Sequence, residues 1–154
     1  MPAPDERSDA TDDGVPLPDA FGAVARELRH RAVRAFAPLD VTPGQVRALR
    51  VLTHHGEMRM SALSEHLRIA PRSGTEVADD LERRGLVRRR PDPDDRRAVL
   101  VALTDEGIRV ADQVRAARDA QGDAYFAVLA EADRRELARI LRVLRENAGG
   151  PGVS

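Results

Sequence analysis

Hydrophobic residues recur at three- and four-residue spacing along several segments of the chain, a pattern that indicates amphipathic helices. The first predicted helix runs from Phe21, and Pro38 ends it. The next begins at Thr42-Pro43-Gly44-Gln45, which predicts a capping box with proline at the first helical position. It ends near Gly56. Its predicted buried residues are Val46, Leu49 and Leu52.

Residues 60–104 predict a short helix, a turn, a second helix and a hairpin. Ser61 is the expected cap of the short helix over residues 62–67, and residues 68–70 form the turn. Pro71 starts the second helix and Gly85 stops it. Its interior residues are expected to be Gly74, Val77, Ala78 and Leu81. Its outward residues are expected to be Arg72, Ser73, Thr75, Glu76, Asp79 and Asp80.

The predicted hairpin has a tip rich in proline and aspartate. Arg88, Arg89 and Arg90 follow Leu86-Val87, and the prolines of residues 91–95 cannot continue a regular strand. Residues 98–103 are small or branched apolar residues, which favours a return strand. A helix pair followed by a hairpin with this many arginines is a shape that fits a DNA duplex.

The remainder of the chain is predicted to be helical. Thr104 is a suitable cap for a long helix that reaches about Leu129 and carries Ile108, Ala111, Val114, Tyr125 and Phe126. A last helix covers about residues 131–147. Its apolar stripe consists of Leu137, Ile140, Leu141 and Leu144. Such a stripe needs a partner surface, either within the monomer or across a dimer.

Charge is informative through its distribution. The 154 residues carry a net charge of -1, so the whole chain gives no argument for nucleic-acid binding. Residues 83–97, however, contain seven arginines and three aspartates, a local charge of +4. A solvated surface is the alternative explanation, but a basic hairpin directly after a helix pair favours contact with phosphates.

Several other classes of function are disfavoured by what the sequence lacks. It has no cysteine, no apolar run of membrane-spanning length and no export signal, so we expect a soluble, cytoplasmic protein. No nucleophile, nucleotide or cofactor motif is present, and we expect neither an enzyme nor a cofactor. His54 and His55 are neighbours that point about 100° apart on a helix, which disfavours a shared metal ion.

Two segments in this order resemble the MarR family of winged-helix transcriptional regulators. They are Leu81-Glu82-Arg83-Arg84-Gly85-Leu86-Val87 and Asp95-Arg96-Arg97-Ala98-Val99-Leu100-Val101-Ala102-Leu103-Thr104. The first is similar to the end of the family's recognition helix, and the second to its wing. The resemblance covers about residues 21–147.

The resemblance implies a mainly α fold with a small β-hairpin wing: a winged helix-turn-helix flanked by N- and C-terminal dimerisation helices. It implies that the wing arginine, Arg97, reaches a minor groove while Asp95 supports the wing. The expected DNA contacts are Ser61, Arg72, Ser73, Thr75, Glu76, Arg88, Arg89, Arg90, Arg96 and Arg97. Glu76 and Asp80 depart from the family pattern, where arginine is frequent, and Glu76 is expected to accept a hydrogen bond from cytosine.

The expected organisation is an acidic disordered tail over residues 1–18, a dimerisation region of residues 19–39 and 105–147, a DNA-binding region of residues 40–104, and a flexible tail of residues 148–154. We expect a homodimeric repressor of a pseudo-palindromic operator in double-stranded DNA, released by a small aromatic effector near Arg34, His54 and His55. The alternative is a helical, dimeric protein-interaction module that kept the scaffold without binding DNA.

Overall fold

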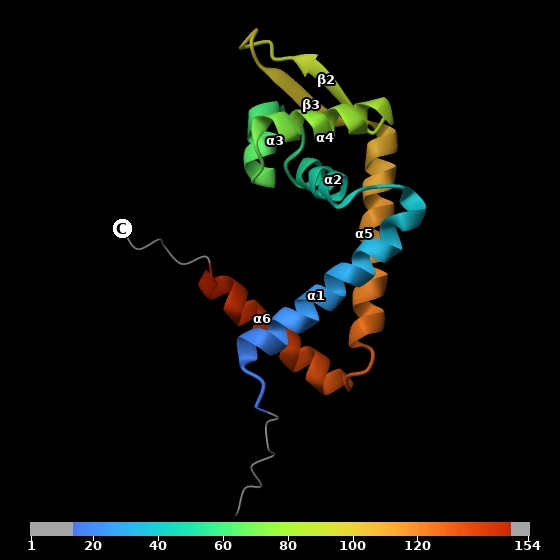
Figure 1. The fold of residues 1–154 in the computed structure, drawn as a ribbon, viewed down its shortest axis with the longest axis vertical. Coiled ribbons are helices and arrows are strands. Elements are labelled where there is room, and N and C mark those ends of the chain that lie inside the picture. Colours follow the sequence, from blue (N-terminus) through green and yellow to red (C-terminus); the bar gives the residue numbers. More distant parts are fainter. Residues whose placement is uncertain (1–13, 149–154) are drawn as a thin grey trace, which may run out of the picture.

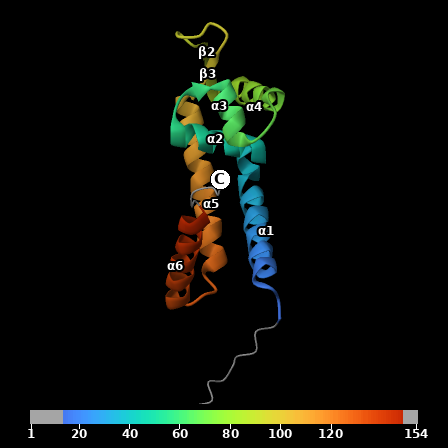
Figure 2. The same cartoon turned by 90° about the vertical axis from the view of Figure 1, so that its left-hand side faces the viewer.

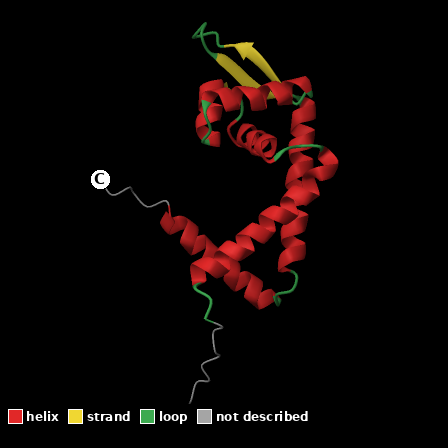
Figure 3. Cartoon of the chain, in the orientation of Figure 1, coloured by secondary structure: helices red, strands yellow, loops and turns green. Residues whose placement is uncertain are grey.

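The computed structural model describes residues 14–148, which form helices and one small sheet (Figures 1 and 3). A winged-helix unit occupies one end of the molecule, and three long helices form an arm below it. The arm consists of α1 (Leu17–Phe36), α5 (Asp105–Phe126) and α6 (Glu131–Ala148). The winged-helix unit consists of α2 (Pro43–His55), β1 (Met58–Arg59), α3 (Met60–Leu67), α4 (Pro71–Arg83), β2 (Val87–Pro91) and β3 (Val99–Leu103).

Local signals set the start and end of most helices. The predicted capping box is confirmed, because the Gln45 amide donates to Thr42 Oγ1 at 3.2 Å and the Thr42 amide donates to Gln45 Oε1 at 3.0 Å. Gly56 follows α2 with φ of 75°, a conformation that favours glycine. The predicted Ser61 cap is wrong. Met60 is the first residue of α3, because the chain enters this helix directly from β1, and Arg59 is the residue before it.

The sheet has three antiparallel strands in the order β1-β3-β2. The predicted hairpin is confirmed, with Val87 paired to Leu103 and Pro91 to Val99. We did not predict β1, which pairs Met58 with Val101 and Arg59 with Leu100. Two residues are too few to produce an alternating pattern, so this strand exists through its pairing with β3.

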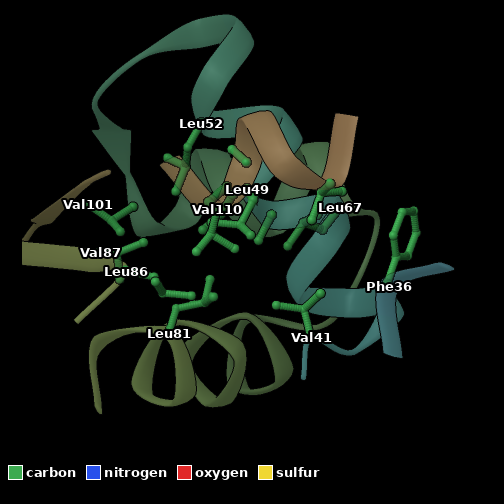
Figure 4. Close-up of a cluster of buried hydrophobic side chains, with 14 residues drawn as sticks. Phe36, Val41, Leu49, Leu52, Leu67, Leu81, Leu86, Val87, Val101 and Val110 are labelled. Carbon is green, nitrogen blue, oxygen red and sulfur yellow. The ribbon is translucent and has the colours of Figure 1, made fainter. Parts of the chain in front are cut away.

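The core lies where the helix pair meets the sheet and α5 (Figure 4). Its largest fully buried side chains are Leu49, Leu52, Leu63, Leu67, Leu81 and Val101. The predicted interior of α4 is largely confirmed, since Gly74, Ala78 and Leu81 are buried and Val77 is partly buried. A Cβ at Gly74 would collide with Ser64 Oγ, so the absence of a side chain lets α3 and α4 cross closely.

The arm differs from expectation in three places. α1 begins at Leu17, inside the segment expected to be a tail, and residues 1–13 of that tail lie outside the described residues. α5 is capped by Thr104 as predicted, but it ends at Phe126, short of Leu129. Of the predicted C-terminal tail, Ala148 ends α6, and residues 149–154 are not described.

α6 stands apart from the rest of the fold. None of its residues, all of which the structure describes, is buried. In Figure 1 it crosses α1, but Figure 2 shows that the two helices lie apart. Residues 14–148 therefore leave much of the predicted stripe uncovered, with Ile140 42% and Leu144 57% exposed. Among the described helices, none is long and apolar enough to cross a membrane.

Candidate DNA-binding site

The N-terminal half of α4 presents a polar surface to solvent. Arg72, Ser73, Thr75 and Glu76 are all exposed, as predicted for the outward side of this helix. Arg72 Nε lies 3.3 Å from Glu76 Oε1, one helical turn away, and the Thr75 hydroxyl donates to the Pro71 carbonyl at 3.1 Å. Glu76 is thus partnered by an arginine of the same surface, which offsets part of its repulsion toward phosphate.

The three consecutive arginines of β2 have different partners. Arg89 lies 2.7 Å from Asp79 and 2.5 Å from Glu82, both on α4. Arg90 makes two hydrogen bonds to Glu57, at 2.5 and 3.0 Å. Arg88 is exposed and has no ion pair with any residue between 14 and 148. The predicted positive charge of this run is therefore largely neutralised at Arg89 and Arg90.

These ion pairs lower the pKa values of the carboxyl groups that form them. The hydrogen bond from Arg89 is the main reason why the pKa of Glu82 lies below its ordinary value of 4.5. The hydrogen bond from Arg90 likewise lowers the pKa of Glu57. Both carboxylates therefore stay charged at neutral pH and hold β2 to α4 and to the segment before β1.

The wing tip is fixed by two aspartates, of which we predicted one. Asp95 Oδ1 accepts from the Arg97 amide at 3.0 Å, which orders the backbone beside the expected minor-groove arginine. Asp92 is only 6% exposed, and it accepts from the Asp94 amide at 2.9 Å and from Arg59 Nε at 2.7 Å. The Asp94 amide is the main cause of its lowered pKa. Sequence reasoning missed Asp92 because its arginine partner lies 33 positions away.

A hollow between the helix pair and the wing brings several predicted residues together. Its polar lining consists of Arg59, Ser61, Thr75, Arg89, Asp95 and Arg97. The residues predicted to contact DNA that do not line this hollow are Arg72, Ser73, Glu76, Arg88, Arg90 and Arg96. The hollow thus lies between α4 and the wing, with Thr75 on its α4 side and Arg97 on its wing side.

A separate cavity of about 410 Å³ lies among α1, α2 and α5. Phe36, Val46, Leu49, Ala111 and Val114 supply much of its apolar lining, and Arg47, Arg50, Arg115 and Arg118 lie around it with a single acid, Asp112. Its size is within the range of small-molecule sites.

Only one of the three residues expected near an effector lines this cavity. That residue is His54. Arg34 lines a different hollow on α1, beside Glu27 and Arg31. His55 stacks on His66 with ring centroids 4.3 Å apart. Burial is the first cause of its lowered pKa, followed by the neighbouring histidines. Arg34 and His55 do not line this cavity, because adjacent or nearby positions on a helix face different directions.

Comparison with known proteins places this architecture in a family. The MarR family model matches residues 41–99, which hold the helix pair and most of the wing. The HTH-type transcriptional repressor MdtR of Bacillus subtilis (strain 168) is 30% identical over 126 residues, covering 82% of this chain and 81% of the relative. The chain belongs to the MarR family.

Solved structures share the fold of this chain. The YusO protein of Bacillus subtilis is 29% identical and superposes with a TM-score of 0.73, covering 82% of this chain and 90% of that one. Wild-type MarR from E. coli superposes with a TM-score of 0.78 at 24% identity over 84% of this chain and 96% of its own, which supports the fold. The predicted fold class, mainly α with a small wing, is confirmed.

The relatives also indicate the class of function. The MarR-family matches with printed functions are transcriptional regulators and not enzymes. This protein is accordingly a DNA-binding transcriptional regulator of the MarR family. The acids that supported a protein-interaction module are partnered here, Glu76 by Arg72 and Asp80 by Arg83.

Proposed function

We propose that this regulator is a homodimeric repressor that binds a pseudo-palindromic operator through α4 and the wing. One observation carries the proposal: Thr75, in the exposed start of α4, and Arg97 of the wing line a single hollow. In winged helix-turn-helix proteins, residues at the start of the second helix read base edges in the major groove. The wing then lies over the neighbouring backbone and minor groove.

The division of the arginines refines which side chains are available to DNA. Arg88, Arg96 and Arg97 are exposed and have no ion pair within residues 14–148, so they are free to bind phosphate or enter a groove. Arg89 and Arg90 already hold the wing in place and are assigned a supporting role. Arg72, Ser73, Thr75 and Glu76 remain the proposed base-reading residues of α4, with Ser61 beside them.

Dimerisation is supported by the uncovered arm. Within the part of the chain that the structure describes, much of the apolar stripe of α6 is uncovered, as are exposed residues of α1, among them Phe21 at 56% and Val33 at 47%. A second copy of the chain offers the same surfaces, and an isologous pairing buries both sets at once. Two winged-helix units related by a two-fold axis then match an inverted repeat in the DNA.

A repressor released by a small aromatic molecule is the mode of regulation that we propose. The printed function of MdtR supports repression. The cavity among α1, α2 and α5 supports an effector, because it joins the arm to the first helix of the winged-helix unit. An effector acts by binding the DNA-incompetent arrangement more tightly than the competent one. Arg115 and Arg118 are paired with Asp112 and Asp119, but Arg47 and Arg50 have no ion pair among residues 14–148 and favour an aromatic molecule that carries negative charge.

Footprinting tests the operator and the dimer together. The DNA is a duplex that the full-length protein selects from a random-sequence pool, and hydroxyl radicals then map its protection. We expect an inverted repeat with two protected segments on one face, about 10 bp apart. Failure to select any sequence, or a single protected half-site, contradicts the proposal.

The effector proposal has its own test. A panel of phenols and benzoates is added to the protein bound to its selected DNA, and release is followed by fluorescence anisotropy. Ala111→Leu, which fills part of the cavity, should bind DNA normally. It should lose sensitivity to the compounds that release wild type from DNA. Equal sensitivity in this variant would place the effector elsewhere, and no release by any compound would contradict an aromatic effector.

A further inference from the structure

Arg59 occupies the one strand that sequence reasoning missed. It lies in β1 opposite Leu100 of β3 and directly before the first residue of α3. Its side chain is 47% exposed and lines the hollow between the helix pair and the wing. Arg59 therefore belongs by position to the proposed DNA surface, although it is outside both the recognition helix and the wing.

Asp92 holds this arginine in a defined orientation. The carboxylate is almost fully buried, and its Oδ2 accepts from Arg59 Nε at 2.7 Å. Asp92 is itself fixed, because its Oδ1 accepts from the Asp94 amide and its own amide donates to the Ala98 carbonyl at 3.0 Å. A bond at Nε leaves the terminal nitrogens Nη1 and Nη2 without a hydrogen bond to any residue from 14 to 148.

The surroundings of Arg59 match the chemistry of a DNA phosphate. Ser61 and Thr75 contribute hydroxyl groups to the same hollow, and Arg97 contributes a second guanidinium that has no ion pair among residues 14–148. Hydroxyls and arginines are the side chains that most often contact phosphate oxygens, and a guanidinium can donate to two of them at once. The single acid on this lining, Asp95, is engaged with the Arg97 amide.

We infer that Arg59 binds a phosphate of the operator backbone, and that buried Asp92 is the positioning residue that aims it. This inference rests on the proposed binding of DNA through α4 and the wing. It adds a contact between the two recognised parts of the site, which fixes their common register on the duplex without reading sequence.

The test is a salt titration of full-length wild type and Arg59→Ala on the selected duplex and on a shuffled duplex, followed by fluorescence anisotropy. Loss of one charge-assisted contact should weaken binding about tenfold. The loss should be similar on both duplexes, and the slope of log K against log salt should fall by about 0.9. Arg109→Ala is the matched control, because Arg109 is also exposed and paired to a carboxylate, Glu106, but lies on α5 away from the hollow.

The direction in which Asp92→Asn changes DNA affinity tests whether Asp92 positions Arg59. Removing a negative charge near DNA strengthens binding if Asp92 acts only through its charge. Weaker binding is expected here, because Arg59 loses the partner that orients it. Thermal unfolding verifies that each variant is folded. If Arg59→Ala does not fold, Arg59→Lys replaces it. Arg59→Lys keeps the charge but not the bond at Nε, and it should lose part of the affinity for DNA.

The outcomes distinguish failure of this inference from failure of the proposed function on which it rests. If wild type does not bind the duplex at low salt, the proposed function fails. If wild type binds and Arg59→Ala, or its lysine replacement, behaves like the Arg109→Ala control, the phosphate contact alone is overturned. If Asp92→Asn binds more tightly than wild type, the positioning role of Asp92 is overturned.

Discussion

Arg88, Arg89 and Arg90 are identical side chains with different environments. Arg89 is 27% exposed and bridges two acids of α4, whereas Arg88 lies on the other side of the strand with no ion pair among the described residues. Neighbouring side chains of a strand point to opposite faces. Arg89 therefore has a structural role, whereas Arg88 is free to contact DNA. Their spacing alone does not reveal the acids that neutralise two of the three.

Substitution of these arginines should separate stability from DNA affinity. Arg89→Ala leaves Asp79 and Glu82 facing each other without a cation, so the free energy of unfolding should fall by about 1 kcal/mol. Arg88→Ala should leave the free energy of unfolding within about 0.5 kcal/mol of wild type and weaken DNA binding. Urea denaturation measures the first quantity and anisotropy the second. Equal stability of the two variants would contradict this division of roles.

The Glu82–Arg89 pair also predicts a dependence of stability on pH. The pKa of Glu82 is lower in the folded protein than its ordinary value of 4.5, so the ion pair stabilises the fold above that pH and loses its effect as the pH falls through the lowered folded value. The difference in unfolding free energy between wild type and Glu82→Gln should be constant near neutrality and shrink below pH 4.5. Urea denaturation from pH 7 downward measures it, and a difference that persists unchanged in acid would count against the pair.

Among the elements, those with local signals were predictable and those that depend on distant partners were not. The Thr42 capping box, Pro71 at the start of α4 and Thr104 at the start of α5 act over a few residues, and all three appear in the structure. β1 and the Arg59–Asp92 bridge connect segments that are far apart in the chain. No local pattern reports such a pairing, so Asp92 was missed, whereas Asp95 was predicted from the family resemblance.

A close contact between α5 and the start of the hairpin gives a prediction about element packing. A Cβ at Gly107 would collide with the Leu86 carbonyl oxygen, which is backbone and also accepts from the Thr104 amide. Gly107→Ala should therefore destabilise the protein by about 1–3 kcal/mol, more than the helix propensity of alanine offsets.

Gly44→Ala in α2 is the control for this substitution. A Cβ at Gly44 would lie 3.8 Å from its nearest neighbour, Val77 Cγ2, which is an ordinary contact distance. The variant should therefore be as stable as wild type or slightly more stable. Thermal denaturation compares the two variants. Comparable melting temperatures for Gly107→Ala and wild type would show that α5 and the hairpin pack less tightly than described.

For the whole molecule, the arm gives the strongest prediction. Leu144 is 57% exposed on the apolar stripe of α6, and the proposed dimer buries that stripe. Leu144→Glu should therefore shift the protein from dimer to monomer at micromolar concentration and reduce operator affinity, because a monomer engages one half-site. Light scattering after size-exclusion chromatography measures the mass. Arg142→Glu, on the same helix but away from the stripe, is the control and should remain dimeric; monomeric wild type would contradict the proposal.

Most of the whole-molecule arrangement follows from the order of the elements, since a helix pair, a hairpin and flanking helices define the winged-helix unit and its arm. What the order leaves open is which arginines are free, because ion pairs between α4, β1 and the wing form only in the assembled fold. The base preference of Arg72 and Glu76 also depends on the duplex, and a carboxylate beside a guanidinium can accept from cytosine while the arginine donates to guanine.

Every function proposed for this protein depends on the binding of duplex DNA by α4 and the wing, with Arg97 as a principal contact. A salt titration of full-length wild type and Arg97→Ala on the selected operator, measured by fluorescence anisotropy, tests it most directly. For wild type, log K should fall linearly with log salt, and for Arg97→Ala the affinity should be lower and the slope smaller by about 0.9. Absence of binding by wild type at low salt, or identical titrations for the two proteins, would contradict the account.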